Sequence, residues 1–92
     1  MDINNVPMVR VTWRDARDTE TGWIDVKDII AAPLATCQEV GWMVVNNDEK
    51  IVIMRSWCLD RDDNHGGGAI ALPKGWITKI EYLQVGHADV RN

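Results

Sequence analysis

Apolar and polar residues alternate along several short stretches of this chain. The clearest case is the segment in which Val9, Val11 and Trp13 are separated by Arg10 and Thr12. A period of two places every second side chain on the same face of a strand, which predicts a strand with one buried face. Alternation together with β-branched composition predicts five strands, over residues 8–14, 34–45, 50–59, 69–72 and 78–83.

The segments between these strands are rich in residues that favour turns. The polar stretch 15–22 is expected to form a loop, and residues 46–49, reading Asn-Asn-Asp-Glu, a turn. Residues 60–68 contain four charges and three consecutive glycines, which predicts a mobile loop. The sequence Pro-Lys-Gly-Trp at 73–76 predicts a tight turn before the last strand.

One short helix is expected between the first two strands. Asp25 is suited to cap a helix, and Val26, Ile29 and Ile30 are spaced to share one face of it. Pro33 ends this helix because the residue before a proline is disfavoured in the α region.

These elements predict a mainly β fold: a small, five-stranded, partly open barrel of the SH3-like or Sm-like kind, with one short helix at most. The turn at 73–76 favours this class, since such barrels change sheets there through one turn of 3₁₀ helix. Residues 1–92 are interpreted as a single domain with an ordered core over 7–84 and a frayed tail over 85–92.

The hairpin formed by residues 34–59 has apolar residues on both faces. If residues 46–49 form a four-residue turn, Val44 faces Ile51 and Met43 faces Val52. The same register places Cys37 opposite Cys58, where two reduced thiols are expected rather than a strained disulfide.

A barrel this small has one interior, so the second face of the hairpin needs a cover. One alternative is that residues 23–34 fold over it. The other is that a second chain covers it, because a large exposed apolar surface marks an association site. The strip expected to mediate self-association, as a homodimer or larger homo-oligomer, consists of Met43, Val45, Val52 and Met54.

Composition narrows the possible partners and the location. Of the 92 residues 46% are hydrophobic, and the net charge is −4, so no basic footprint for non-specific DNA binding is present. The chain has no apolar segment long enough to cross a membrane, and residues 1–5 lack the positive charge that begins a signal peptide, so neither a signal peptide nor a membrane partner is expected. Two cysteines in such a chain predict a cytoplasmic location.

No catalytic centre, metal site or cofactor is predicted. The acidic loop beginning at Asp60 resembles a calcium loop, but its glycine is one place late and Ala71 stands where a bidentate Glu is required. His65 and His87 lack the spacing of zinc ligands. Both lie in segments expected to be mobile, which cannot hold a base beside a nucleophile such as Ser56. We therefore expect a protein that is not an enzyme.

Aromatic residues next to cations are the most suggestive chemistry in the chain, which has five Trp, one Tyr and no Phe. Nucleobases stack on indole rings, and phosphates bind neighbouring cations. The candidate ligand- or partner-binding residues are Trp13 with Arg14 and Arg17, Trp57 with Arg55, and Trp76 with Lys74 and Lys79. The alternative is that these tryptophans belong to the core and the charges lie at strand edges.

Several landmarks resemble those of a known group of proteins. They are Val11-Thr12-Trp13-Arg14-Asp15-Ala16, Gly22-Trp23, Val40-Gly41-Trp42 and Ala71-Leu72-Pro73-Lys74-Gly75-Trp76-Ile77-Thr78-Lys79-Ile80. Together they resemble the small uncharacterised accessory proteins of tailed bacteriophages and prophages, over residues 9–83. The resemblance implies a product made in an infected bacterium, and such products often block or sequester a host component, including defence proteins or their nucleotide signals.

The leading expectation is therefore a phage-type accessory protein that acts by stoichiometric binding to a host component, as a take-over or anti-defence inhibitor. A second hypothesis is an Sm-like module that binds a nucleotide or RNA through its Trp–cation pairs. A third is a minor structural protein of a virion.

Overall fold

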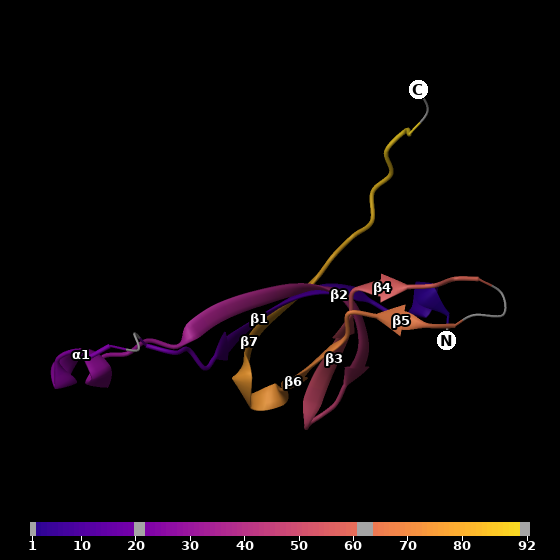
Figure 1. Ribbon diagram of the computed structural model, residues 1–92. Helices are drawn as coiled ribbons and strands as arrows, with labels where there is room; N and C mark the ends of the chain where they lie inside the picture. Colours follow the sequence, from indigo (N-terminus) through magenta and orange to yellow (C-terminus); the bar gives the residue numbers. More distant parts are fainter. Residues whose placement is uncertain (1, 20–21, 61–63, 91–92) are drawn as a thin grey trace.

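The computed structural model describes residues 2–19, 22–60 and 64–90, and its main feature is one antiparallel sheet (Figure 1). The sheet has five strands in the order β6-β3-β2-β1-β7. Their bounds are β1 Met8–Asp15, β2 Ala35–Asn46, β3 Lys50–Met54, β6 Ile70–Pro73 and β7 Ile77–Tyr82. Each strand lies within one or two residues of a segment predicted from the sequence, except that the predicted strand 50–59 is shorter.

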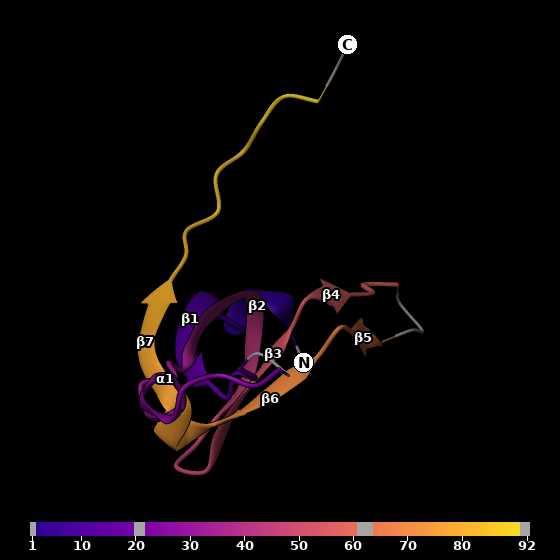
Figure 2. The same ribbon diagram turned by 60° about the vertical axis from the view of Figure 1, so that its left-hand side comes forward.

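The strand order and the element before the last strand define the class of fold. The 3₁₀ helix η2 (Lys74–Trp76) connects β6 to β7, which are the two outermost strands of the sheet. The sheet curves without closing (Figure 2). The prediction of a mainly β, partly open barrel of the SH3-like kind with one short helix is confirmed. That helix is α1 (Val26–Ile30). The residue before it, Asp25, has an extended backbone conformation.

The core lies on the concave face of this sheet and follows from the alternation in the sequence. Strand β1 is buried at every second residue, beginning with Val9. Seven hydrophobic residues form the buried cluster: Val9, Val11, Trp13, Met43, Ile51, Ile53 and Leu72. Burial of apolar area at about 25 cal/mol per Å² makes this cluster the main source of stability of the fold.

The hairpin register differs from the prediction. Met43 pairs with Ile53, and Val45 pairs with Val52, because a bulge between Met43 and Val45 adds one residue to β2. Insertion of a single residue moves the side chains beyond it to the opposite face of the strand. As a result Met43 is only 7% exposed in the core, while Val52 lies on the opposite face of the hairpin and is half-buried. The predicted strip of four residues is therefore wrong for Met43.

The turn that closes this hairpin is also shorter than predicted. Asn46 still pairs with Ile51 within the sheet. The Asn47 side-chain oxygen accepts hydrogen bonds from the backbone N–H groups of Glu49 and Lys50, both at 2.9 Å. An asparagine that bonds its own backbone a few residues on is a common way to form such a turn.

The predicted strand 50–59 is divided at Arg55. The strand β4 (Ser56–Trp57) leaves the barrel and pairs with β5 (Gly66–Gly67) as a separate two-stranded ribbon (Figure 1). The prediction that all of 60–68 forms a loop is thus wrong at residues 66 and 67. Cys58 does not reach Cys37, which pairs with Trp13 instead, and these two cysteines, both in the described ranges, form no disulfide.

Gly41 is needed where β2 and β3 cross closely. A Cβ atom at this position would lie 2.6 Å from Ile53 Cγ2 and 2.6 Å from the backbone oxygen of Met54. Both distances are shorter than van der Waals contact, and the second involves backbone that cannot rotate away. The glycine therefore sets how closely the strands of the barrel pack.

The molecule is more extended than a compact domain of its length. Its radius of gyration is 18.1 Å, whereas a compact chain of this length has about 12 Å. Its accessible surface is 7440 Å², which is about 2,000 Å² more than is typical for this mass. Residues 16–19 and 22–34, which we call the arm, extend away from the barrel and end in α1 (Figure 1).

One alternative drawn from the sequence predicted that the arm covers the second face of the hairpin. The arm does not do so. Trp23, in the arm, is 104% exposed. Residues 83–90 contain no helix or strand, and the end of this segment runs away from the barrel (Figure 2). Positions 20–21, 61–63 and 91–92, which belong to predicted loops and to the predicted tail, lie outside the described residues, as does position 1. The helices in the described ranges are all too short to span a bilayer.

Candidate functional site

The structure brings together two of the predicted binding residues that are far apart in sequence, Arg14 and Trp76. They line one pocket of about 380 Å³ at the base of the arm. The other lining residues are Asp15, Ala16, Leu34, Gly75 and Thr78. A volume of this size lies in the range of small-molecule sites, which are about 300–1,000 Å³.

Pairing between β1 and β7 explains why this pocket forms. Trp13 is paired with Ile77. Arg14 is therefore the residue directly after the last paired position of β1. Trp76 is the residue directly before the first paired position of β7. η2 holds the indole of Trp76 at the pocket, where 45% of its surface is exposed. Leu34, the residue directly before β2, completes the apolar part of the pocket wall.

A bidentate ion pair secures the same two strands on their outer face. Arg10 Nε lies 2.9 Å from Glu81 Oε1, and Arg10 Nη2 donates to Glu81 Oε2 at 2.9 Å. The hydrogen bond from this guanidinium lowers the pKa of the Glu81 carboxyl, and the same pair raises the pKa of Arg10. The pair helps to fix the register that places Arg14 beside Trp76.

Arg14 supplies the available charge of the pocket. Within the described part of the chain its guanidinium forms no ion pair or side-chain hydrogen bond, and the residue is exposed. The Asp15 carboxylate, by contrast, accepts hydrogen bonds from Trp13 Nε1 at 3.3 Å and from the Ala16 backbone N–H at 2.7 Å. Thr78 Oγ1 donates to the Thr12 carbonyl at 3.2 Å. The pocket therefore offers an indole face and a cation.

The remaining predicted Trp–cation groups do not form stacking platforms. Trp13 is 4% exposed in the core, so its ring has no free face for a base. Trp57 packs edge-on against Trp42, with ring centroids 5.8 Å apart, and its Nε1 donates to Asn64. Arg55 forms an ion pair with Glu39 at 3.2 Å. Burial and internal contacts thus remove these residues from the candidate site.

The three other predicted cations lie outside the pocket lining. The Lys74 amine donates to the Asn46 side chain, and the Lys79 amine lies 3.5 Å from the Glu81 carboxylate. Arg17 lines a separate hollow on the arm. Sequence reasoning missed Leu34 and Thr78, because their place in the pocket depends on how β1, β2 and β7 come together.

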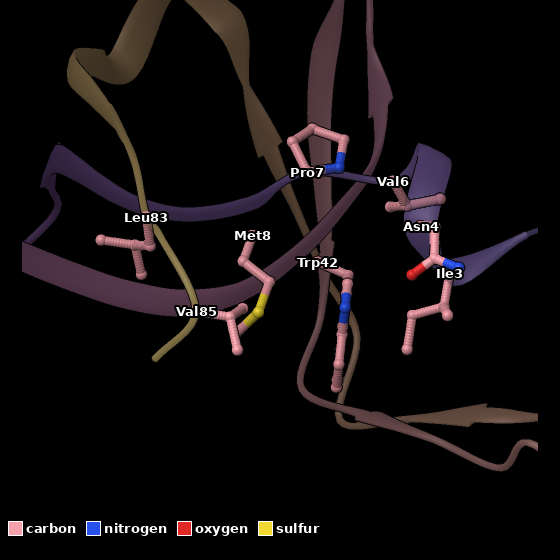
Figure 3. A pocket seen from close by; sticks show the side chains of 8 residues that line it. All are labelled: Ile3, Asn4, Val6, Pro7, Met8, Trp42, Leu83 and Val85. Atoms are coloured by element: carbon pink, nitrogen blue, oxygen red, sulfur yellow. The ribbon is translucent and has the colours of Figure 1, made fainter. Parts of the chain in front are cut away.

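A second feature is an apolar groove at the other end of the barrel, which we call the Trp42 groove. It has a volume of about 460 Å³ and is lined by Ile3, Asn4, Val6, Pro7, Met8, Trp42, Leu83 and Val85. Figure 3 shows the Trp42 side chain in its middle, with Met8 and Val85 on one side and Ile3 on the other. Asn4 is its single polar lining residue.

Comparison with known proteins gives no relative for this site. No family model, no curated protein and no solved structure matches the chain. Among the described residues no three His, Cys, Asp or Glu side chains are grouped so that they could hold a metal ion.

Proposed function

We propose that this chain is a non-catalytic binding protein of the phage accessory type, which sequesters a small anionic aromatic ligand of the host, such as a mononucleotide, one per chain. The observation that carries the proposal is the pocket that Trp76, whose surface is 45% exposed, lines together with Arg14, whose guanidinium has no ion-pair partner among the described residues. A base stacks on an indole, and a guanidinium binds phosphate through two parallel hydrogen bonds.

The chemistry of the lining supports binding rather than catalysis. Nucleophilic or acid–base catalysis needs a reactive group beside a base that is free to take its proton. Here the Asp15 carboxylate already accepts two N–H groups, and the Thr78 hydroxyl donates to a backbone carbonyl. The groups that remain, an indole and a guanidinium, recognise a ligand without reacting with it.

Charge favours a small ligand over a strand of nucleic acid. Binding along a phosphate backbone relies on many Lys and Arg side chains that release counterions. The chain has a net charge of −4, and the lysines near the pocket, Lys74 and Lys79, are engaged by neighbouring side chains. The guanidinium of Arg14 is the one cation in the lining of this pocket, and it is matched to one phosphate group.

The resemblance to phage accessory proteins supplies the biological setting of the proposal. Such proteins often act by removing a host molecule from use, and a stoichiometric binder needs only affinity and abundance to do so. A nucleotide signal is the kind of host component whose chemistry fits this pocket. We also propose that the protein works as a homo-oligomer, with the arm rather than the predicted strip as the association surface.

Equilibrium dialysis against the four ribonucleoside monophosphates tests the proposal. We expect at least one of them to bind with a stoichiometry of one per chain. Trp76→Leu should weaken that binding about tenfold or more, because stacking on an indole contributes about 1–3 kcal/mol. Tyr82→Leu is the matched control, since it removes an aromatic ring that is 66% exposed and lies outside the pocket lining. Absence of binding at millimolar nucleotide, or equal binding by the Trp76→Leu protein, would contradict the proposal.

A further inference from the structure

We infer that the arm of one chain seats its apolar residues in the Trp42 groove of a second copy, so that two chains exchange arms in a symmetric dimer. This inference is independent of the ligand pocket. It begins from the arm, whose exposed apolar side chains are Trp23 (104%), Val26 (68%), Ile29 (50%), Ile30 (80%) and Leu34 (54%). A fully exposed Trp on a projecting segment is typical of the anchors that dominate protein interfaces.

The arm also needs a partner for its own structure. α1 has five residues, and an isolated helix of that length is not stable in water because nucleation costs more than so few hydrogen bonds return. No buried residue of α1 ties it to the barrel. Packing of Val26 and Ile30 against another surface supplies the stabilisation that the barrel of the same chain does not.

The Trp42 groove is a suitable receptor for this arm. The side chains that line it are apolar except for that of Asn4, so Trp23 and Ile30 can leave water there. Its volume of about 460 Å³ is large enough to enclose an anchor side chain. Trp42 offers Trp23 an aromatic partner, and such pairs add to the gain from burial.

The position of the two features selects a second copy as the partner. Figure 1 shows α1 at one end of the molecule and η1 (Ile3–Asn5), which forms one wall of the groove, at the other. The arm therefore does not reach the groove of its own chain. Two copies related by a twofold axis seat both arms at once and leave no unfilled groove, which closes the assembly as a dimer.

The available area is sufficient for a stable dimer. A specific interface buries about 800 Å² on each partner. The chain exposes roughly 2,000 Å² more surface than is expected for its mass, and the apolar residues of the arm and of the groove are part of this exposed surface. Reciprocal exchange uses the arm and the groove of each chain, so both partners contribute both surfaces.

Sedimentation velocity at about 50 µM tests the inference, and we expect a dimer for the wild-type protein. Trp23→Asp should raise the dimer dissociation constant about 100-fold or more, as loss of an anchoring tryptophan typically does. Val85→Asp, in the groove at a residue 70% exposed, should dissociate the dimer as well. Thr19→Asp is the matched control, because it adds the same charge to the arm at an exposed polar residue and should leave the dimer intact.

Mixing the two variants separates arm exchange from other modes of association. The Val85→Asp chain retains a functional arm and the Trp23→Asp chain retains a functional groove, so the mixture should regain a heterodimer that neither variant forms alone. A monomeric wild-type protein, a dimer that survives Trp23→Asp, or a mixture that stays monomeric would each overturn the inference. Circular dichroism of each variant shows that loss of the dimer is not loss of the fold.

Discussion

Replacing Trp13 by alanine is expected to destabilise the protein by about 3–5 kcal/mol, the usual range for removal of a buried Trp. The indole is 4% exposed and lies among Val11, Ile51 and the other core residues. Its removal therefore leaves a cavity that the surrounding core side chains cannot fill. It also removes the N–H that the Asp15 carboxylate accepts. In a domain of this size the loss is a large part of the total stability.

Thermal unfolding followed by circular dichroism measures this effect, and Tm should fall by about 15 °C or more. Trp76→Ala is the matched control. It removes the same side chain from a site where 45% of the surface is already in water, so its cost should be much smaller. A Trp13→Ala protein as stable as the Trp76→Ala protein would mean that Trp13 is not part of the core.

These two tryptophans also show what the sequence alone could predict. Alternation around Val9, Val11 and Trp13 was sufficient to place a strand and its buried face, because period two is a local property of the chain. The same pattern left open whether Trp13 was core or a stacking surface, and burial decides for the core. The local sequence around Trp76 does not distinguish it from a core tryptophan either, yet Trp76 lies at the pocket.

The register of the hairpin was not predictable in the same way. The bulge near Val44 is one extra residue, and nothing in the local composition distinguishes it from regular strand. Its effect is nevertheless large, since it moves Met43 into the core and away from Val52. The fold could thus be predicted from the alternation, whereas the assignment of faces in β2 required the paired strands themselves.

The pocket depends on contacts between segments that are distant in sequence. Arg14 and Trp76 were each noted as part of a Trp–cation group, but their proximity follows from the pairing of β1 with β7. One of the two alternatives drawn from the sequence was that residues 23–34 cover the second face of the hairpin, because they are rich in apolar residues. The arm extends outwards instead (Figure 1), and the local apolar pattern of its residues does not determine that direction.

Replacing Arg14 by glutamine is expected to weaken binding of a nucleoside monophosphate by about 10- to 100-fold. A hydrogen bond to a charged group contributes about 1.5–3 kcal/mol, and glutamine keeps a donor while losing the charge. Because Arg14 is exposed, the substitution should leave the free energy of unfolding almost unchanged. The loss of affinity is then attributable to the site and not to the fold.

Two comparisons make this experiment specific. Arg17→Gln removes a cation three residues further along, in a hollow of the arm separate from the pocket, and should change the affinity little. Binding of the uncharged nucleoside should be equally weak in the wild-type and Arg14→Gln proteins, since it has no phosphate for the guanidinium. If Arg17→Gln and Arg14→Gln weaken binding equally, the effect is one of overall charge and the pocket is not the site.

The most direct test of ligand binding at the Arg14–Trp76 pocket is to follow the five indole N–H signals of the ¹⁵N-labelled protein during a titration with a nucleoside monophosphate. Each tryptophan gives one such signal, so the measurement reports which ring the ligand meets. The proposed function predicts that the Trp76 signal shifts in proportion to occupancy and saturates at one ligand per chain, while the signal of the buried Trp13 moves far less. A titration in which Trp76 does not shift, or in which only the signal of Trp23 or Trp42 does, would contradict it.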